Sequence, residues 1–283
     1  MLTPELTAQL TLLALLVPLA LAALAIAGWR GRLSPQRLIH APHRPVVIQG
    51  HELLATAFLF LTGMMLGALA QEMIFPQRPT DPTGRALMML CGQVIGYLLP
   101  VGYLLGMVIH RQQGWRAFGL WPVAARHFKT AILATLVALP VVMALSSLGA
   151  AATILLGNPP PEAGHELLKL INEPDARYAG LLVTISAVVV APFVEELLYR
   201  GLLQTFMLQR LGTHKRWAIL LIVAFIFSAV HQGSVHPAMF PALFGLGLIL
   251  GWLYETTGSL VPPILVHALF NAINLILASM MMG

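Results

Sequence analysis

The stretch Val194-Glu195-Glu196-Leu197-Leu198-Tyr199-Arg200 places two adjacent acids and one base inside a long apolar run. The residues on both sides of it, 181–193 and 201–208, are mostly apolar. A charged group at membrane depth costs a few kcal/mol on insertion scales, so two adjacent acids there indicate a functional site.

The spacing of these charges predicts two different roles. Glu196 and Arg200 are four residues apart, so on a helix they face each other and can form an ion pair. Glu195 is turned about 100° away from Glu196 and does not share that pair. We therefore expect Glu196 to be structural and Glu195 to be available for chemistry.

The composition predicts an all-α polytopic membrane protein. The chain has 283 residues, of which 58% are hydrophobic and 10% charged, whereas a soluble domain carries about 25% charged residues. The net charge of +5 could suggest nucleic-acid binding, but its placement in alternate loops makes it a topology signal. The single cysteine, Cys91, excludes an intramolecular disulfide.

About eight segments have the roughly 20 mostly apolar residues that a transmembrane helix needs. They are residues 6–29, 53–73, 86–109, 130–156, 178–210, 216–231, 237–255 and 259–282. Pro140 is expected to interrupt the fourth segment. We divide the chain into three N-terminal spans with their loops (1–130) and a five-span catalytic core (131–283), within one membrane unit.

Basic loops alternate with loops that contain few basic residues. Three loops hold the clusters Arg30/Arg32/Arg37/Arg44, Arg111/Arg116/Arg126/Lys129 and Arg210/Lys215/Arg216. By the positive-inside rule these loops are cytoplasmic and both termini are outside, in what we expect to be a prokaryotic cell membrane. Residues 165–171 are expected to form an amphipathic helix on the outer surface, and residues 116–121 an interfacial segment.

Two of the rare polar residues in the last spans are predicted to lie at one depth. Glu195 precedes Arg210 by fifteen residues and His231 follows Arg216 by fifteen. At 1.5 Å rise per residue, each lies roughly 22 Å from the shared basic loop. An antiparallel hairpin of these two helices therefore brings Glu195 and His231 to the same level.

His267 and Asn271 are four residues apart, hence on one face of the last span. Their depth matches less closely, because Pro262 and Pro263 are expected to break the helix there. Each polar residue also has a structural alternative: a lone histidine or asparagine in a membrane often only bonds a neighbouring helix. Glu255 is expected to be an interfacial or capping residue.

Together these residues resemble the three motifs of the CAAX-protease and bacteriocin-processing family, also called CPBP or Abi, which includes the type 2 CAAX prenyl proteases. The motifs are Glu195-Glu196-xxx-Arg200, Phe227-xxx-His231 and His267-xxx-Asn271. They lie within residues 180–275, and the first four spans resemble the family only in being apolar.

The resemblance implies an intramembrane, glutamate-dependent endopeptidase, with CAAX-type processing as one possible activity. Its candidate catalytic residues are Glu195, Glu196, His231, His267 and Asn271, with Arg200 and Phe227 as structural support. Glu195 and His231 would activate water, and His267 and Asn271 would donate hydrogen bonds to the oxyanion. The expected partners are the lipid bilayer and a membrane-associated protein or peptide substrate, with no nucleic acid.

Three alternatives remain open. One carboxylate and two imidazoles are a plausible zinc set, but HExxH is absent and asparagine is an uncommon zinc ligand, so we favour a mechanism with no metal cofactor. A non-proteolytic scaffold or bacteriocin-immunity protein would keep the fold and bind a partner. A transporter would also use buried acids and histidines, but it would usually show repeated halves, and none is seen.

Overall fold

The computed structural model describes residues 3–34, 36–41, 47–111, 114–160, 177–232 and 235–282. Within these ranges the chain is helical and contains no strand beyond one isolated bridge between Gln232 and Val235. Among the residues that the structure describes, seven helices are long and apolar enough to cross a membrane, and α12 (Val261–Met282) corresponds to the eighth predicted span. The predicted all-α polytopic membrane architecture is therefore confirmed.

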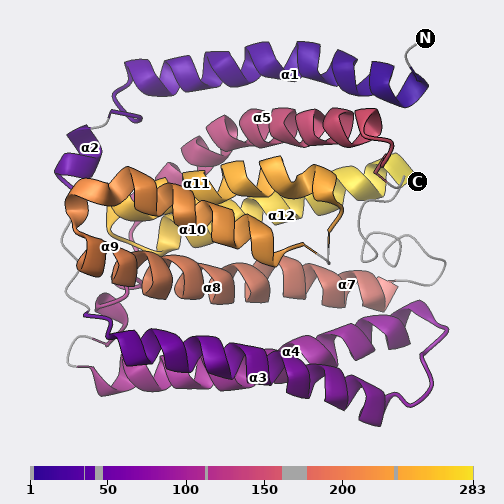
Figure 1. Ribbon diagram of the computed structural model, residues 1–283, viewed down its shortest axis with the longest axis vertical. Helices are drawn as coiled ribbons and strands as arrows, with labels where there is room; N and C mark the ends of the chain where they lie inside the picture. Colours follow the sequence, from indigo (N-terminus) through magenta and orange to yellow (C-terminus); the bar gives the residue numbers. More distant parts are fainter. Residues whose placement is uncertain are drawn as a thin grey trace. The chain divides into compact units, whose positions relative to one another are not determined.

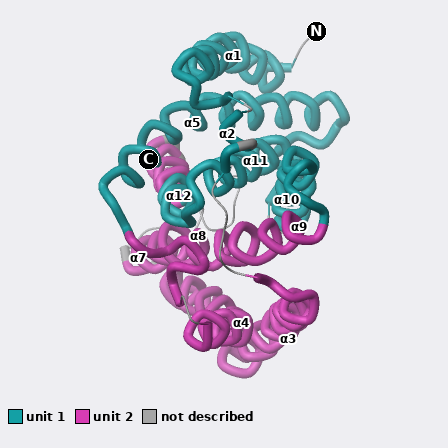
Figure 2. The backbone as a smooth tube through the Cα atoms, turned by 90° about the vertical axis from the view of Figure 1, so that its left-hand side faces the viewer, with its two compact units in different colours: residues 1–43, 123–165, 211–267 teal, residues 44–122, 166–210, 268–283 magenta. Residues whose placement is uncertain are grey.

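The chain forms two compact units that alternate along the sequence (Figure 2). The first comprises residues 1–43, 123–165 and 211–267, and the second comprises residues 44–122, 166–210 and 268–283. The helix α12 passes from the first unit to the second at Ala268. The functional boundary that we expect near residue 130 is a different division of the chain and stays a prediction.

The first unit contains α1 (Pro4–Trp29), α2 (Gln36–Ile39), α5 (Ala125–Leu155), α10 (Arg216–Val230) and α11 (Phe240–Thr257). Helix α1 lies alongside α5, and α11 packs on both α5 and α10 (Figure 1). Glycines allow the close contacts: a Cβ at Gly149 would collide with the carbonyl oxygen of Ala238, and one at Gly245 with Leu145. Small residues at helix contacts are what packing in a membrane relies on.

Pro140 does not interrupt the fourth span, contrary to the prediction. It is buried inside α5, which runs unbroken from Ala125 to Leu155. Prolines are tolerated inside membrane helices because neighbouring helices, Ser and Thr side chains or local adjustments satisfy the backbone groups that they free.

Glu255 is a buried ion-pair partner rather than a capping residue. Its Oε1 lies 3.0 Å from Nε of Arg216, and its side chain is 3% exposed. Nη1 of the same arginine donates to the carbonyl oxygen of Leu38 at 2.6 Å. Arg216 thus joins the start of α10, the end of α11 and the short helix α2.

The second unit contains the hairpin of α3 (Gly50–Ile74) and α4 (Pro82–His110), which lie side by side in Figure 1. Gly63 and Gly67 of α3 abut the backbone of Gly96 and Gly92 in α4 so closely that a Cβ would collide with a carbonyl oxygen. Helix α4 also packs on α7 (Arg177–Ile185), the start of the helix that carries the acidic pair.

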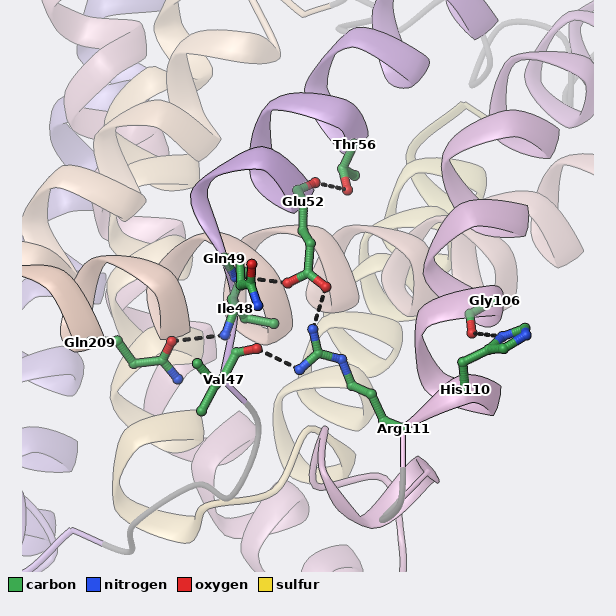
Figure 3. A network of polar contacts seen from close by, with 9 residues as sticks. All are labelled: Val47, Ile48, Gln49, Glu52, Thr56, Gly106, His110, Arg111 and Gln209. Carbon is green, nitrogen blue, oxygen red and sulfur yellow. Dashed lines mark hydrogen bonds and ion pairs between the residues drawn. The ribbon is translucent and has the colours of Figure 1, made fainter.

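A polar network holds the chain that enters α3 (Figure 3). Arg111 forms an ion pair with Glu52 and donates to the carbonyl oxygen of Val47. The Ile48 N–H donates to Oε1 of Gln209 at 2.9 Å. The network therefore ties the start of α3 to the end of α4 and to α9 (Thr205–Leu211), beside a hollow of about 560 Å³ lined in part by Tyr103 and His110.

Two further predictions concern the loops. In the segment 116–121, Ala117 and Phe118 are buried and Trp121 is exposed, with a cis peptide bond before Pro122. The amphipathic helix predicted over residues 165–171 lies outside the described part of the chain.

Candidate active site

The acidic pair lies on a helix that contains two π-helical segments. The elements α7, η2 (Ser186–Val190), α8 (Ala191–Glu196), η3 (Leu197–Gln204) and α9 follow one another without a break (Figure 1). Both η2 and η3 are π-helical. Glu195 and Glu196 are the last residues of α8, directly before the second π-helical segment. Such local widening of a helix is frequent at functional sites.

The two acids have different surroundings. Oε1 of Glu196 lies 2.8 Å from Nη1 of Arg200, and both side chains are fully buried. The predicted ion pair is therefore present, and it is shielded from solvent within the protein. Glu195 is only half-buried. The expected division between a structural acid, Glu196, and an acid available for chemistry, Glu195, stays a prediction.

Polar groups that the sequence analysis did not single out lie around Glu195. Two tyrosines, Tyr97 of α4 and Tyr199 of η3, are within range of electrostatic interaction with its carboxylate. Near Tyr97, Oε1 of Gln93 accepts a hydrogen bond from Oγ of Ser186. The sequence could have pointed to Gln93 and Tyr97, because they are polar residues four positions apart in a mostly apolar span.

His231 directly follows α10, which has only 15 residues. A helix of that length rises about 22 Å, less than the hydrocarbon thickness of about 30 Å. Nδ1 of His231 lies 2.6 Å from the carbonyl oxygen of Phe227. Because a carbonyl oxygen only accepts, Nδ1 carries a hydrogen, and in the neutral form of the ring Nε2 is then the acceptor nitrogen. This tautomer suits a base, an acceptor that orients water, or a metal ligand.

Phe227 connects the two predicted histidines within the first unit. Its ring centroid lies 4.8 Å from that of His231 and 5.8 Å from that of His267, the latter contact being edge-on. Phe227 is fully buried, and His267 is 4% exposed. Gly247 of α11 makes room for this ring, since a Cβ there would lie 3.2 Å from Cδ1 of Phe227. Phe227 thus contacts both histidine rings, and its role as structural support stays a prediction.

Asn271 lies one turn beyond His267 on α12. The expected break at Pro262 and Pro263 is absent: α12 begins at Val261, and the Ile264 N–H donates to the Leu260 carbonyl oxygen at 3.0 Å. Prolines in a first helical turn remove no intrahelical hydrogen bond. Nδ2 of Asn271 donates to the carbonyl oxygen of Ala187 at 2.8 Å, so one of its two amide hydrogens bonds a neighbouring helix.

The predicted residues thus form two groups. Phe227, His231 and His267 are in contact in the first unit, while Glu195, Glu196, Arg200 and Asn271 belong to the second. Over the part of the chain that the structure describes, no three His, Cys, Asp or Glu side chains are grouped as a metal site. The residues of the zinc alternative, one carboxylate (Glu195) and two imidazoles (His231 and His267), are all among the described residues.

Residues 177–273 match the family model described as type II CAAX prenyl endopeptidase, Rce1-like. The resemblance seen in the motifs is thereby confirmed for this part of the chain. The Rce1-like match begins at α7 and includes every predicted site residue from Glu195 to Asn271. The description of that family is that of a protease. Gln93 and Tyr97 lie outside it.

The comparison with curated proteins gave no match, and neither did the comparison with solved structures.

Proposed function

We propose that this chain is an intramembrane endopeptidase that hydrolyses a peptide bond of a membrane-associated protein or peptide, as in CAAX processing. One observation carries the proposal: the segment that matches the endopeptidase family holds all the polar residues of the three motifs. The different burial of Glu195 and Glu196 supports separate roles for the two acids.

In the proposed reaction Glu195 accepts a proton from water, and the water oxygen attacks the carbonyl carbon of the scissile bond. His231 orients the water through Nε2, which is consistent with its Nδ1–H donating to Phe227. The carbon–nitrogen bond then breaks, and the proton held by Glu195 passes to the leaving amine.

His267 and Asn271 donate hydrogen bonds to the oxyanion that forms during the attack. Asn271 can do so because its amide has two hydrogens and the bond to Ala187 uses one of them. Glu196 and Arg200 brace the helix beneath Glu195 through their buried ion pair. The contact of Phe227 with both histidine rings would fix their orientation.

The experiment uses purified protein in detergent with an internally quenched, farnesylated peptide that ends in a CAAX sequence, and with its unprenylated counterpart. Glu195→Gln should lower the cleavage rate by about 10²-fold or more, since it removes the general base. Glu72→Gln is the matched control, because Glu72 is an exposed acid near the end of α3, and it should cleave as wild type does. Undiminished cleavage by Glu195→Gln would contradict the proposal, and no cleavage of either peptide by wild type would favour the scaffold or immunity alternative.

A further inference from the structure

The hollow beside Arg111 is bounded by polar side chains from two neighbouring spans, all within the second unit (Figure 3). Its volume of about 560 Å³ lies within the range of about 300–1,000 Å³ that is usual for small-molecule sites. Three of the lining residues follow one another at helical spacing and so share one face of α4. The lining residues include Gln49, Glu52, Tyr103, Gly106, His110 and Arg111.

The hollow lies where two apolar spans end. Helix α3 begins at Gly50, and α4 ends at His110. The ends of spans lie at the boundary between hydrocarbon and water, where the head groups of lipids are found. Beside the hollow, Leu54 and Ile109 are 71% and 72% exposed, as side chains that face lipid tails are. A membrane lipid is therefore the molecule that this position brings to the hollow.

Arg111 supplies hydrogen-bond donors for an anionic group. Its Nη2 pairs with Glu52, and its Nη1 donates to the carbonyl oxygen of Val47. Within the described residues these contacts use two of the five N–H groups of a guanidinium. The others, together with the hydroxyl group of Tyr103, can donate to the oxygens of a phosphate.

Glu52 supplies an acceptor for a cationic group in the same hollow. Its Oε1 accepts from Arg111, and its Oε2 accepts from the Gln49 N–H at 2.7 Å. A carboxylate has about four acceptor positions, so it can accept further hydrogen bonds. The side chains of Arg111 and Glu52 are 24% and 12% exposed, so solvent screens them less than surface charges. Charges of both signs complement a zwitterion better than a simple anion.

Gly106 keeps the space between these groups open. Among the described residues, a Cβ at Gly106 would meet no heavy atom within 4 Å. Its carbonyl oxygen lies 2.8 Å from Nδ1 of His110, whose ring is turned back along α4 (Figure 3). A larger side chain at position 106 would therefore occupy the hollow without displacing the helix.

We propose that this hollow binds the head group of a zwitterionic phospholipid with a primary ammonium group, phosphatidylethanolamine. The phosphate accepts hydrogen bonds from Arg111 and Tyr103, and the ammonium group donates to the carboxylate of Glu52. A choline head group has no ammonium hydrogen to donate, and a glycerol head group brings no cation to Glu52. The inference does not depend on the proposed endopeptidase activity.

Native mass spectrometry of the purified full chain in detergent measures the binding of phosphatidylethanolamine, phosphatidylcholine and phosphatidylglycerol in separate titrations. Wild type should bind phosphatidylethanolamine about tenfold or more tightly than the other two lipids, as expected for hydrogen bonds between charged groups. Gly106→Leu should lose this preference, because its side chain fills the hollow. Gly102→Leu is the matched control and should keep it: Gly102 lies one turn earlier on α4, and a Cβ there also meets no described heavy atom within 4 Å.

Tyr103→Phe tests the hydrogen bonds rather than the space. It keeps the ring, removes one donor to the phosphate, and should weaken the binding of phosphatidylethanolamine about tenfold. The melting temperature of each variant without added lipid shows that it is folded. Equal binding of the three lipids by wild type, or an undiminished preference in either folded variant, would overturn the inference. Equally tight binding of water-soluble phosphoethanolamine would also overturn it, because the hollow would then take a soluble phosphate compound.

Discussion

Two adjacent glutamates differ because their neighbours differ. Glu196 and Arg200 are both fully buried and are joined at 2.8 Å. A buried pair of this kind adds little net stability, because both charges lose their hydration, yet removing one partner is strongly destabilising. The acid in the preceding position, Glu195, is half-buried and lies within electrostatic range of Tyr97 and Tyr199.

Glu196→Gln should therefore lower the free energy of unfolding by about 3 kcal/mol, because it leaves the Arg200 guanidinium buried beside a neutral amide. Glu195→Gln should unfold at nearly the wild-type temperature while losing activity. Thermal unfolding of both variants in the same detergent measures the difference.

Adding Arg200→Met to Glu196→Gln provides the control for charge burial. The double variant should recover part of the lost stability, since no uncompensated charge remains. Equal melting temperatures for Glu195→Gln and Glu196→Gln would contradict the separate roles of the two acids.

At the scale of helices, hydropathy predicted the elements well, because a membrane span needs a fixed length of apolar sequence. The helix predicted over residues 216–231 is observed as Arg216–Val230, and the one over 53–73 as Gly50–Ile74. Two of the wrong predictions concern residues whose role depends on neighbouring helices: Pro140 stays within α5, and Glu255 pairs with Arg216 of another helix.

The site was predicted only where local spacing determines contacts. The pair Glu196–Arg200 follows from helical periodicity alone, and it is observed. The π-helical segments around Glu195 have no signature in hydropathy, which averages over several turns. Tyr97 comes within electrostatic range of Glu195 because α4 packs on the helix that begins with α7, a contact between spans that are far apart in the sequence.

At the scale of the whole molecule, we propose that the three basic loops are cytoplasmic, following the positive-inside rule. Gly212 and Gly157, one from each side of the fifth span, have φ angles of +86° and +76°, so a cysteine there would be strained. We therefore place single cysteines at the exposed neighbours His214 and Asn158 in a Cys91→Ala background. A membrane-impermeant maleimide should label Asn158→Cys in intact cells and His214→Cys only after permeabilisation.

Cleavage of the reporter peptide by each labelled variant is the control for native folding. Labelling of His214→Cys from outside, with Asn158→Cys protected, would reverse the orientation of the whole chain in the membrane.

We propose that Glu195, together with His231, activates water without a metal ion. Hydrolysis by metal-stripped protein is the measurement that decides this. Purified protein is treated for a prolonged period with a strong chelator, its metal content is measured by elemental analysis, and peptide cleavage is then compared with untreated protein and with Glu195→Gln. We predict well under one metal ion per chain, cleavage at the untreated rate, and no cleavage by Glu195→Gln. Loss of activity on chelation and its recovery with stoichiometric zinc would contradict this account, and Glu195, His231 and His267 would then be the candidate ligands.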